Sequence, residues 1–141
     1  MSKKKYIVVA EERPVFAEIY RQHIEQQGYL VLTCTTHEEL WLCFRASASN
    51  IGCLILGRMY VRMLHEFLRD MRSEQLLSLI PMALVNTPWS TDQNTVVEEL
   101  QTTNADLYAQ GVDWIGSNMN WDELLQMVKI LTNYNKNGKQ I

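Results

Sequence analysis

The chain has 141 residues, of which 47% are hydrophobic and 21% are charged, a balance typical of one globular domain with a substantial core. A formal net charge of -3 gives no overall attraction to nucleic acid, and the one basic cluster is the lysine run at 3–5. No apolar run is long enough for a membrane span or a secretory signal, so we expect a cytoplasmic protein that binds neither membranes nor nucleic acid.

Residues 6–10 form an apolar, β-branched run that predicts the first strand. Pro14 suits the first turn of the helix that follows, and Gly28 is a typical residue after a helix C-terminus. Between them, apolar residues recur at helical spacing at Phe16, Ile19, Tyr20 and His23 or Ile24.

Residues 29–34 predict the second strand. Thr36 and Glu39 then have the spacing of a capping box, in which each side chain accepts a hydrogen bond from the other residue's amide. The apolar face of the helix that they open contains Leu40, Trp41, Phe44 and Ala48.

The run from Cys53 to Leu56 is short, apolar and ended by Gly57, which predicts a strand buried on both faces at the centre of a parallel sheet. In open α/β sheets, functional groups gather just beyond the carboxyl ends of such strands. Here that place holds Gly57 and Arg58, with no carboxylate.

The second half of the chain continues the alternation of helix and strand. The next helix has a buried stripe at Met63, Leu64, Phe67, Leu68 and Met71. A strand is predicted at 80–85, followed by a helix capped by Ser90 or Thr91 with an apolar face at Val96, Val97 and Leu100.

The last strand is predicted at 113–116, after a short irregular connection through Ala109 and Gly111. Asn120 and Glu123 have the spacing of a second helix start. The core face of that final helix contains Leu124, Leu125, Met127, Val128 and Leu131.

Five strands alternating with five helices predict an α/β domain with one parallel sheet, right-handed crossovers and helices on both faces. We expect a single domain over 1–141, with its core at about 5–132 and a polar tail at 133–141. Cys34, Cys43 and Cys53 have no zinc-site spacing, and we interpret them as free thiols, two of them in core segments, of a reducing compartment.

This pattern resembles the receiver domain of two-component response regulators. Residues 7–15 resemble the family's first strand, acidic pair and helix start, 111–115 its approach to the fifth strand, and 122–125 the start of its last helix. The resemblance implies the flavodoxin-like (βα)5 fold of CheY, with strand order 2-1-3-4-5.

Receiver domains accept a phosphoryl group on an aspartate after strand three, with Mg²⁺ held by two acids after strand one. A hydroxyl after strand four and a lysine after strand five contact the phosphoryl oxygens. This chain departs from that pattern, because the acceptor position falls on Gly57, or on Arg58 if the register shifts by one, and neither forms an acyl phosphate. The matching pocket residues are Glu11, Glu12, Gly57, Arg58, Asn86 or Thr87, and Ser117 or Asn118.

Glu11 and Glu12 are each one methylene longer than aspartate and make a poor Mg²⁺ site without the central carboxylate. The favoured interpretation is two solvated acids at the start of the first helix, where the helix dipole favours negative charge. The alternative is that Arg58 pairs with one of them and imitates the metal-bound state without metal.

We therefore expect a degenerate pseudo-receiver that is not an enzyme, uses no metal or cofactor, and acts in signalling as a phosphorylation-independent interaction module. It would serve alone as an adaptor or as the N-terminal domain of a transcriptional regulator. A protein partner, or a second copy in a homodimer, would bind the face that receivers use. Its residues here are Val96, Val97, Tyr108, Trp114 and Met127.

The alternative is a flavodoxin-like protein that binds or converts a small molecule at the strand ends. The chain has no glycine-rich phosphate loop, and its three histidines lie on predicted helices as surface or packing residues. A third interpretation is a receiver that is still switched by a small molecule, held among aromatic side chains at the pocket mouth, which we otherwise expect to pack on one another. These residues are Tyr60, Trp89 and Trp121.

Overall fold

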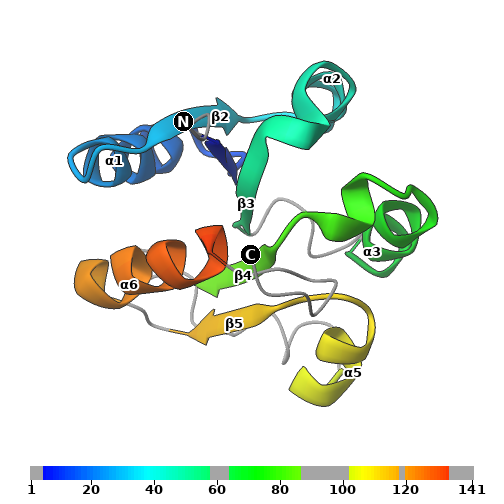
Figure 1. Cartoon of the computed structure of the whole chain (residues 1–141). Helices are drawn as coiled ribbons and strands as arrows, with labels where there is room; N and C mark the ends of the chain where they lie inside the picture. The colour runs from blue at the N-terminus through cyan, green and yellow to red at the C-terminus, as the bar shows by residue number, and fades with distance from the viewer. Residues whose placement is uncertain (1–4, 58–63, 87–101, 118–119, 134–141) are drawn as a thin grey trace.

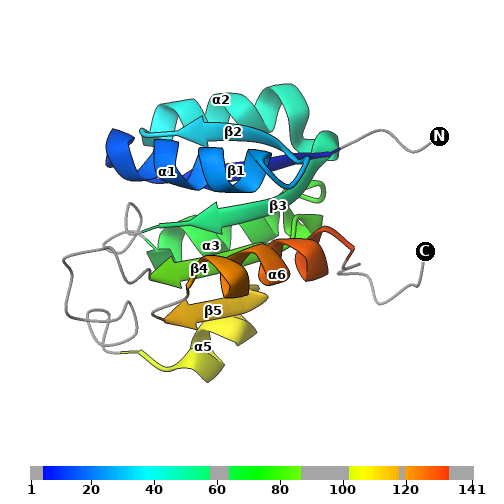
Figure 2. The same cartoon turned by 90° about the vertical axis from the view of Figure 1, so that its left-hand side faces the viewer.

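The computed structural model describes residues 5–57, 64–86, 102–117 and 120–133. Five parallel strands form one sheet in the order β2-β1-β3-β4-β5, which confirms the predicted fold class and strand order. The strands are β1 (Tyr6–Ala10), β2 (Leu30–Cys34), β3 (Ile51–Leu56), β4 (Met82–Asn86) and β5 (Trp114–Ser117). Every strand pair is parallel, so the carboxyl ends share one edge of the sheet; the arrowheads of β2, β3, β4 and β5 point the same way in Figure 2.

Helices cover both faces of the sheet, with α1 and α6 on one side and α2, α3 and α5 on the other (Figure 1). The helices are α1 (Pro14–Glu25), α2 (His37–Ser47), α3 (Leu64–Ser73), α5 (Asn104–Ala109) and α6 (Trp121–Thr132). Two short 3-10 turns, η1 (Ala48–Asn50) and η3 (Leu77–Leu79), precede β3 and β4. The helix predicted around Val96, Val97 and Leu100 lies outside the described residues.

All six residues of β3 are buried, as the position of the strand between both helical layers requires. Leu54 and Leu56 pack with the layer of α2, α3 and α5, whereas Cys53 and Ile55 pack with α1 and α6. This alternation follows from the two-residue period of a strand. A continuous apolar run is therefore stable only at the centre of the sheet.

The connection before β5 differs from the prediction, because α5 occupies a segment expected to be irregular. The Thr103 side chain accepts a hydrogen bond from the Asp106 amide at 3.1 Å, and Leu107 is buried. A capped helix of six residues with a single buried residue is too short to show helical periodicity in the sequence. β5 also begins one residue later than predicted, where the Asp113 carboxylate instead accepts from the Met82 amide at 2.8 Å.

The predicted helix starts are confirmed in part. The Thr36 hydroxyl accepts from the Glu39 amide, but the Glu39 carboxylate accepts from the amide and hydroxyl of Thr35 rather than from Thr36. At α6, Asn120 Oδ1 accepts from the Glu123 amide, and the Glu123 carboxylate accepts from Asn120 Nδ2. In both helices, the glutamate carboxylate therefore accepts hydrogen bonds from a donor other than the backbone amide of the cap residue.

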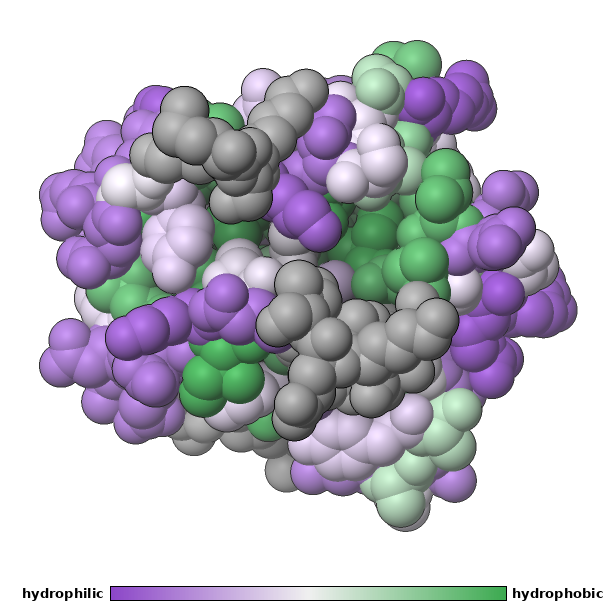
Figure 3. Space-filling model, in the orientation of Figure 1, coloured by the Kyte–Doolittle hydropathy of each residue, from purple (hydrophilic) through white to green (hydrophobic). Residues whose placement is uncertain are grey.

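Hydrophilic side chains surround the edge of the sheet where the strands begin, and hydrophobic side chains show at the surface between α2 and α3 (Figure 3). Leu76 and Leu79, which follow α3, are 57% and 39% exposed. None of the helices in the described part of the chain is both long enough and apolar enough to span a membrane.

Candidate functional site

The candidate site lies where β1 and β3 end, at the carboxyl edge of the sheet. Ala10 pairs with Leu56 in the register of the two strands, so Glu11 and Gly57 follow side by side. The Gly57 amide donates to the Ala10 carbonyl at 2.9 Å, and the Glu11 amide donates to the Cys34 carbonyl at 3.0 Å. Backbone hydrogen bonds from β2 and β3 therefore fix the position of Glu11.

The Glu11 carboxylate lies directly against Gly57. A Cβ atom built on Gly57 would stand 3.1 Å from Glu11 Cδ and 3.2 Å from each carboxylate oxygen. Real Cβ atoms seldom approach so closely, so any side chain at this position would displace Glu11. The carboxylate of Glu11 thus occupies the space into which a residue-57 side chain would project.

Arg13 holds this carboxylate from the start of α1. Its Nη2 and Nε donate to Glu11 Oε1 at 2.5 and 3.1 Å, and its guanidinium carbon lies 4.3 Å from the centre of the Phe16 ring. Glu11 is only 1% exposed, whereas the Arg13 side chain is 29% exposed. The ion pair therefore joins a buried anion to a cation that still reaches solvent.

The second carboxylate oxygen of Glu11 has no hydrogen-bond partner among the described residues, although it is buried. Burying a carboxylate oxygen without a donor is unfavourable, so the arrangement depends on the two bonds that Arg13 gives to Oε1. Among the described residues, no cluster of three or more His, Cys, Asp and Glu side chains is placed to share a metal ion.

These contacts correct the interpretation of the acidic pair. Glu12 is exposed as expected, but Glu11 is buried and does not act as a solvated acid. Neither glutamate caps α1, whose N-cap is Arg13 and whose first turn contains no acid. The guanidinium beside Glu11 comes from Arg13, two residues along, while Arg58 lies outside the described residues.

The remaining predicted pocket positions lie at the ends of the next two strands. Asn86 is the last residue of β4 and pairs with Ser117, the last residue of β5. Leu56 pairs with Leu84, so the ends of β4 and β5 share one edge with Glu11 and Gly57. Thr87 and Asn118 lie outside the described residues.

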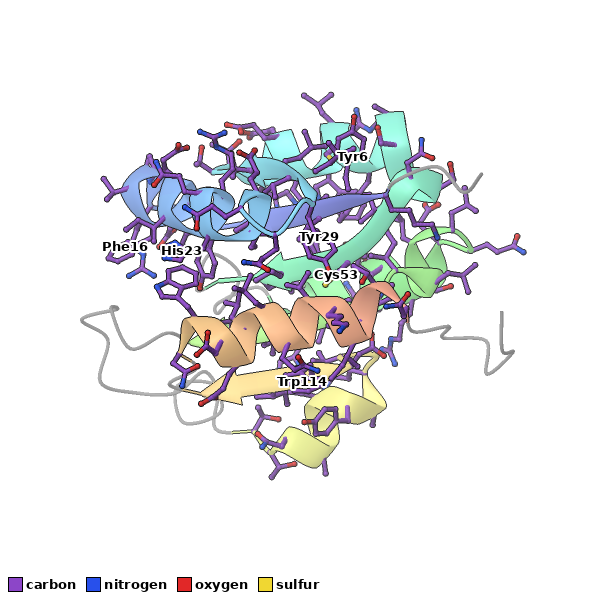
Figure 4. All side chains as sticks on the ribbon, turned by 60° about the vertical axis from the view of Figure 1, so that its left-hand side comes forward. Tyr6, Phe16, His23, Tyr29, Cys53 and Trp114 are labelled. Carbon is purple, nitrogen blue, oxygen red and sulfur yellow. The ribbon has the colours of Figure 1, made fainter. Side chains whose placement is uncertain are left out.

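Trp121, at the start of α6, packs against α1. Its ring stacks on His23 with centroids 3.7 Å apart and planes at 6°, and it meets Tyr20 edge-on at 5.9 Å. His23 and Phe16 both project from α1 on the side shown in Figure 4. The Trp121 ring thus packs against side chains of α1. Tyr60 and Trp89 lie outside the described residues.

Only some of the residues predicted to form the interaction face are both described and at least partly exposed. Tyr108 on α5 is 47% exposed, and Trp114 on β5 is half-buried against the core beneath α6 (Figure 4). Met127 is fully buried, which corrects its assignment to this face, because the same helical stripe holds Leu124, Val128 and Leu131 in the core. Val96 and Val97 lie outside the described residues.

A cavity of about 220 Å³ lies at the opposite edge of the sheet. Its lining combines the end of α3, the η3 turn, the start of β4 and the turn before β5. Since Met82 opens β4, this cavity is not the strand-end pocket of the small-molecule alternative.

Sequence reasoning missed the role of Arg13 and the contact between Cys34 and Cys43. Arg13 follows Glu11 by two residues, and this spacing was the sequence signal that could have indicated the ion pair. The cysteine contact joins a strand end to the second turn of the next helix, which spacing alone does not reveal.

Neither a protein-family model nor a curated protein matches the sequence. Solved structures do match the fold. A response regulator receiver protein from Pseudomonas putida is 19% identical with a TM-score of 0.70, covering 92% of this chain and 99% of that one. The chemotaxis response regulator CheY4 of Vibrio cholerae is 15% identical with a TM-score of 0.69, covering 92% and 99%. The fold of this chain is therefore the CheY-like receiver fold.

Proposed function

We propose that this domain is a signalling module of the receiver type that works without aspartyl phosphorylation. The observation that carries the proposal is the contact of the Glu11 carboxylate with Gly57. In a phosphorylatable receiver, an aspartate side chain would start from this position. Here the position has no carboxylate, and Glu11 fills the adjacent space.

The Glu11–Arg13 pair supports a pocket that is permanently charge-balanced. Phosphoryl transfer to a carboxylate needs a free nucleophilic oxygen and a divalent ion beside the phosphoryl oxygens. Oε1 of Glu11 already accepts two hydrogen bonds from a guanidinium, so the Arg13 charge already balances this carboxylate. The same contacts favour Gly57 over Arg58 as the residue at the acceptor position.

The test is treatment of the protein with acetyl phosphate and Mg²⁺, followed by intact-mass measurement. We expect no phosphoryl addition, while a receiver domain with an acceptor aspartate gains one under the same conditions. A stable, Mg²⁺-dependent addition to the wild-type chain would overturn the proposal. Gly57→Asp is expected to remain a poor acceptor, because its carboxylate would compete for the space of Glu11.

An interaction role is the second part of the proposal, and we place its surface on α5 and β5. Tyr108 is exposed on α5, and Trp114 belongs to β5, an edge strand of the sheet. Exposed aromatic side chains are enriched at protein interfaces, and a sheet edge offers unpaired backbone groups. The partner is a protein or a second copy of this chain.

Sedimentation over a range of concentrations, together with binding to any partner found by affinity capture, tests this surface. We expect Tyr108→Ser to weaken association without unfolding the domain, because the side chain is 47% exposed. Leu42→Ser is a matched control, since Leu42 is 59% exposed on α2, on another part of the molecule. Equal behaviour of wild type and both variants would place the interface elsewhere.

A further inference from the structure

Two of the three cysteines meet at the margin of the sheet. Cys34 is the last residue of β2, which is an edge strand, and Cys43 lies in α2, the helix that follows. Both belong to the packing of one apolar cluster that includes Leu40 and Phe44 from the same helix. Cys34 is 3% exposed, whereas Cys43 is only partly buried.

A hydrogen bond from the Cys34 thiol lowers the pKa of Cys43 to about 7. The same bond, followed by burial, raises the pKa of Cys34. The pair therefore combines a partly exposed cysteine whose thiol has a lowered pKa with a buried cysteine next to it.

Cys53 shows the contrasting environment. It lies in the interior of β3, between the sheet and the layer of α1 and α6 (Figure 4), and is 0% exposed. Burial, with a smaller contribution from the Asp113 charge, raises the pKa of its thiol. A buried neutral thiol is inert to oxidants, so Cys53 is an internal control.

We propose that Cys34 and Cys43 form an oxidisable dithiol site that hydrogen peroxide closes to an intramolecular disulfide. The Cys43 thiolate attacks one peroxide oxygen, the O–O bond breaks, and hydroxide leaves to give a sulfenic acid on Cys43. The sulfur of Cys34 then attacks the Cys43 sulfur, the S–O bond breaks, and the hydroxyl leaves as water with the Cys34 proton. In total, two thiols and one peroxide give one disulfide and two waters.

The two side chains come together across one strand–helix connection and pack in the same apolar cluster, which is the placement that an intramolecular disulfide requires. The site also adjoins the candidate pocket, since the carbonyl of Cys34 accepts the hydrogen bond from the Glu11 amide. In a reducing compartment such a disulfide is transient and is reopened by thiol exchange. The chemistry of the pair does not depend on the proposed function of the pocket.

Peptide mapping of the wild-type protein tests the proposal. Tryptic cleavage after Arg21 and Arg45 leaves both cysteines on peptide 22–45, while Cys53 lies on peptide 46–58. After peroxide treatment, unfolding and alkylation, we expect peptide 22–45 to lack two hydrogen atoms and carry no alkyl group. Peptide 46–58 should be alkylated in full, and prior reduction should restore alkylation of both thiols on 22–45.

Three results would overturn the proposal: full alkylation of peptide 22–45 after peroxide, oxygen addition without hydrogen loss, or a disulfide between two chains on a non-reducing gel. Variants assign the roles of the two sulfurs. Cys53→Ala should still form the disulfide. Cys34→Ala should lose it and accumulate a sulfenic acid on Cys43 that dimedone traps, and trapping elsewhere would refute the assigned order of attack.

Discussion

The central strand β3 and the edge of the sheet just beyond it bury different kinds of side chain. All six residues of β3 are buried, and the side chains among them are apolar apart from one thiol. At the strand end, the chain instead buries Glu11, the one buried charged side chain among the described residues. The interior is stabilised by removing apolar surface from water, whereas the edge needs Arg13 as donor and Gly57 as free space. A carboxylate is therefore tolerated only where both conditions hold.

The strongest way to break this comparison is to move a carboxylate one residue inward. Leu56 is 0% exposed and immediately precedes Gly57, and Leu56→Asp would bury a charge with no cation within the apolar cluster. We expect a loss of several kcal/mol, comparable with a total domain stability of about 5–15 kcal/mol, and thus an unfolded protein by circular dichroism. Leu56→Met, which conserves volume, should stay folded, and a wild-type melt of Leu56→Asp would refute the comparison.

Removing the cation at the edge should have the next largest effect. Arg13→Gln deletes charged donors to a carboxylate that is 1% exposed, and we expect urea denaturation to show a loss of about 1.5–3 kcal/mol. Arg21→Gln is the matched control, because Arg21 pairs with Glu18 and Glu25 on the solvent side of α1. Those acids are 45% and 42% exposed, so water screens the pair and replaces it readily. Equal losses for both variants would show that burial of Glu11 has no energetic role.

A smaller change tests the space above Gly57. Gly57→Ala places a Cβ atom 3.1 Å from Glu11 Cδ, and the side chain of Glu11 has to move. We expect a cost of about 1–2 kcal/mol from overpacking, measured as a shift in the denaturation midpoint. In a Glu11→Ala background the obstacle is gone, so the same substitution should cost clearly less. An unchanged cost in that background would locate the strain at another contact.

The sequence predicted the interior much better than the edge. Alternation and burial follow from apolar periodicity, so β1 and β3 and the buried stripes of α3 and α6 emerged from local patterns. Glu11 was expected in solvent as an acid at the start of the first helix, where the helix dipole favours negative charge. Its burial depends on two nonlocal facts, the Ala10–Leu56 register and the missing side chain at Gly57.

The contact between Cys34 and Cys43 is equally nonlocal, since it depends on how α2 lies across β2. Met127 illustrates the opposite error. Its residue type suggested an interface, but its place in the helical stripe with Leu124 and Leu131 had already assigned it to the core. Residue type was thus a weaker guide than periodicity wherever the two disagreed.

The smallest expected effect is a difference in thiol reactivity that leaves the fold unchanged. It compares Cys53 in the interior of the sheet with Cys34 and Cys43 at its edge. The thiolate is the form that iodoacetamide attacks, so the alkylation rate of Cys43 should rise with pH through a midpoint near its pKa of about 7. Cys53 should not react in the folded protein, because burial raises the pKa of its thiol and excludes the reagent.

The hydrogen bond from Cys34 is the largest cause of the low pKa of Cys43, and partial burial acts in the opposite direction. Removing the donor with Cys34→Ala should therefore move the midpoint upward, toward the value of about 8.5 for an unperturbed thiol. Among the described residues, the Glu39 carboxylate is the charged side chain that acts on the pair, through Cys34, and Glu39→Gln should leave the Cys43 midpoint almost unchanged. Rates are read as alkylation of peptide 22–45 in each protein, and circular dichroism checks that the variants are folded. A midpoint that is the same in wild type and Cys34→Ala would mean that the two thiols do not interact in solution.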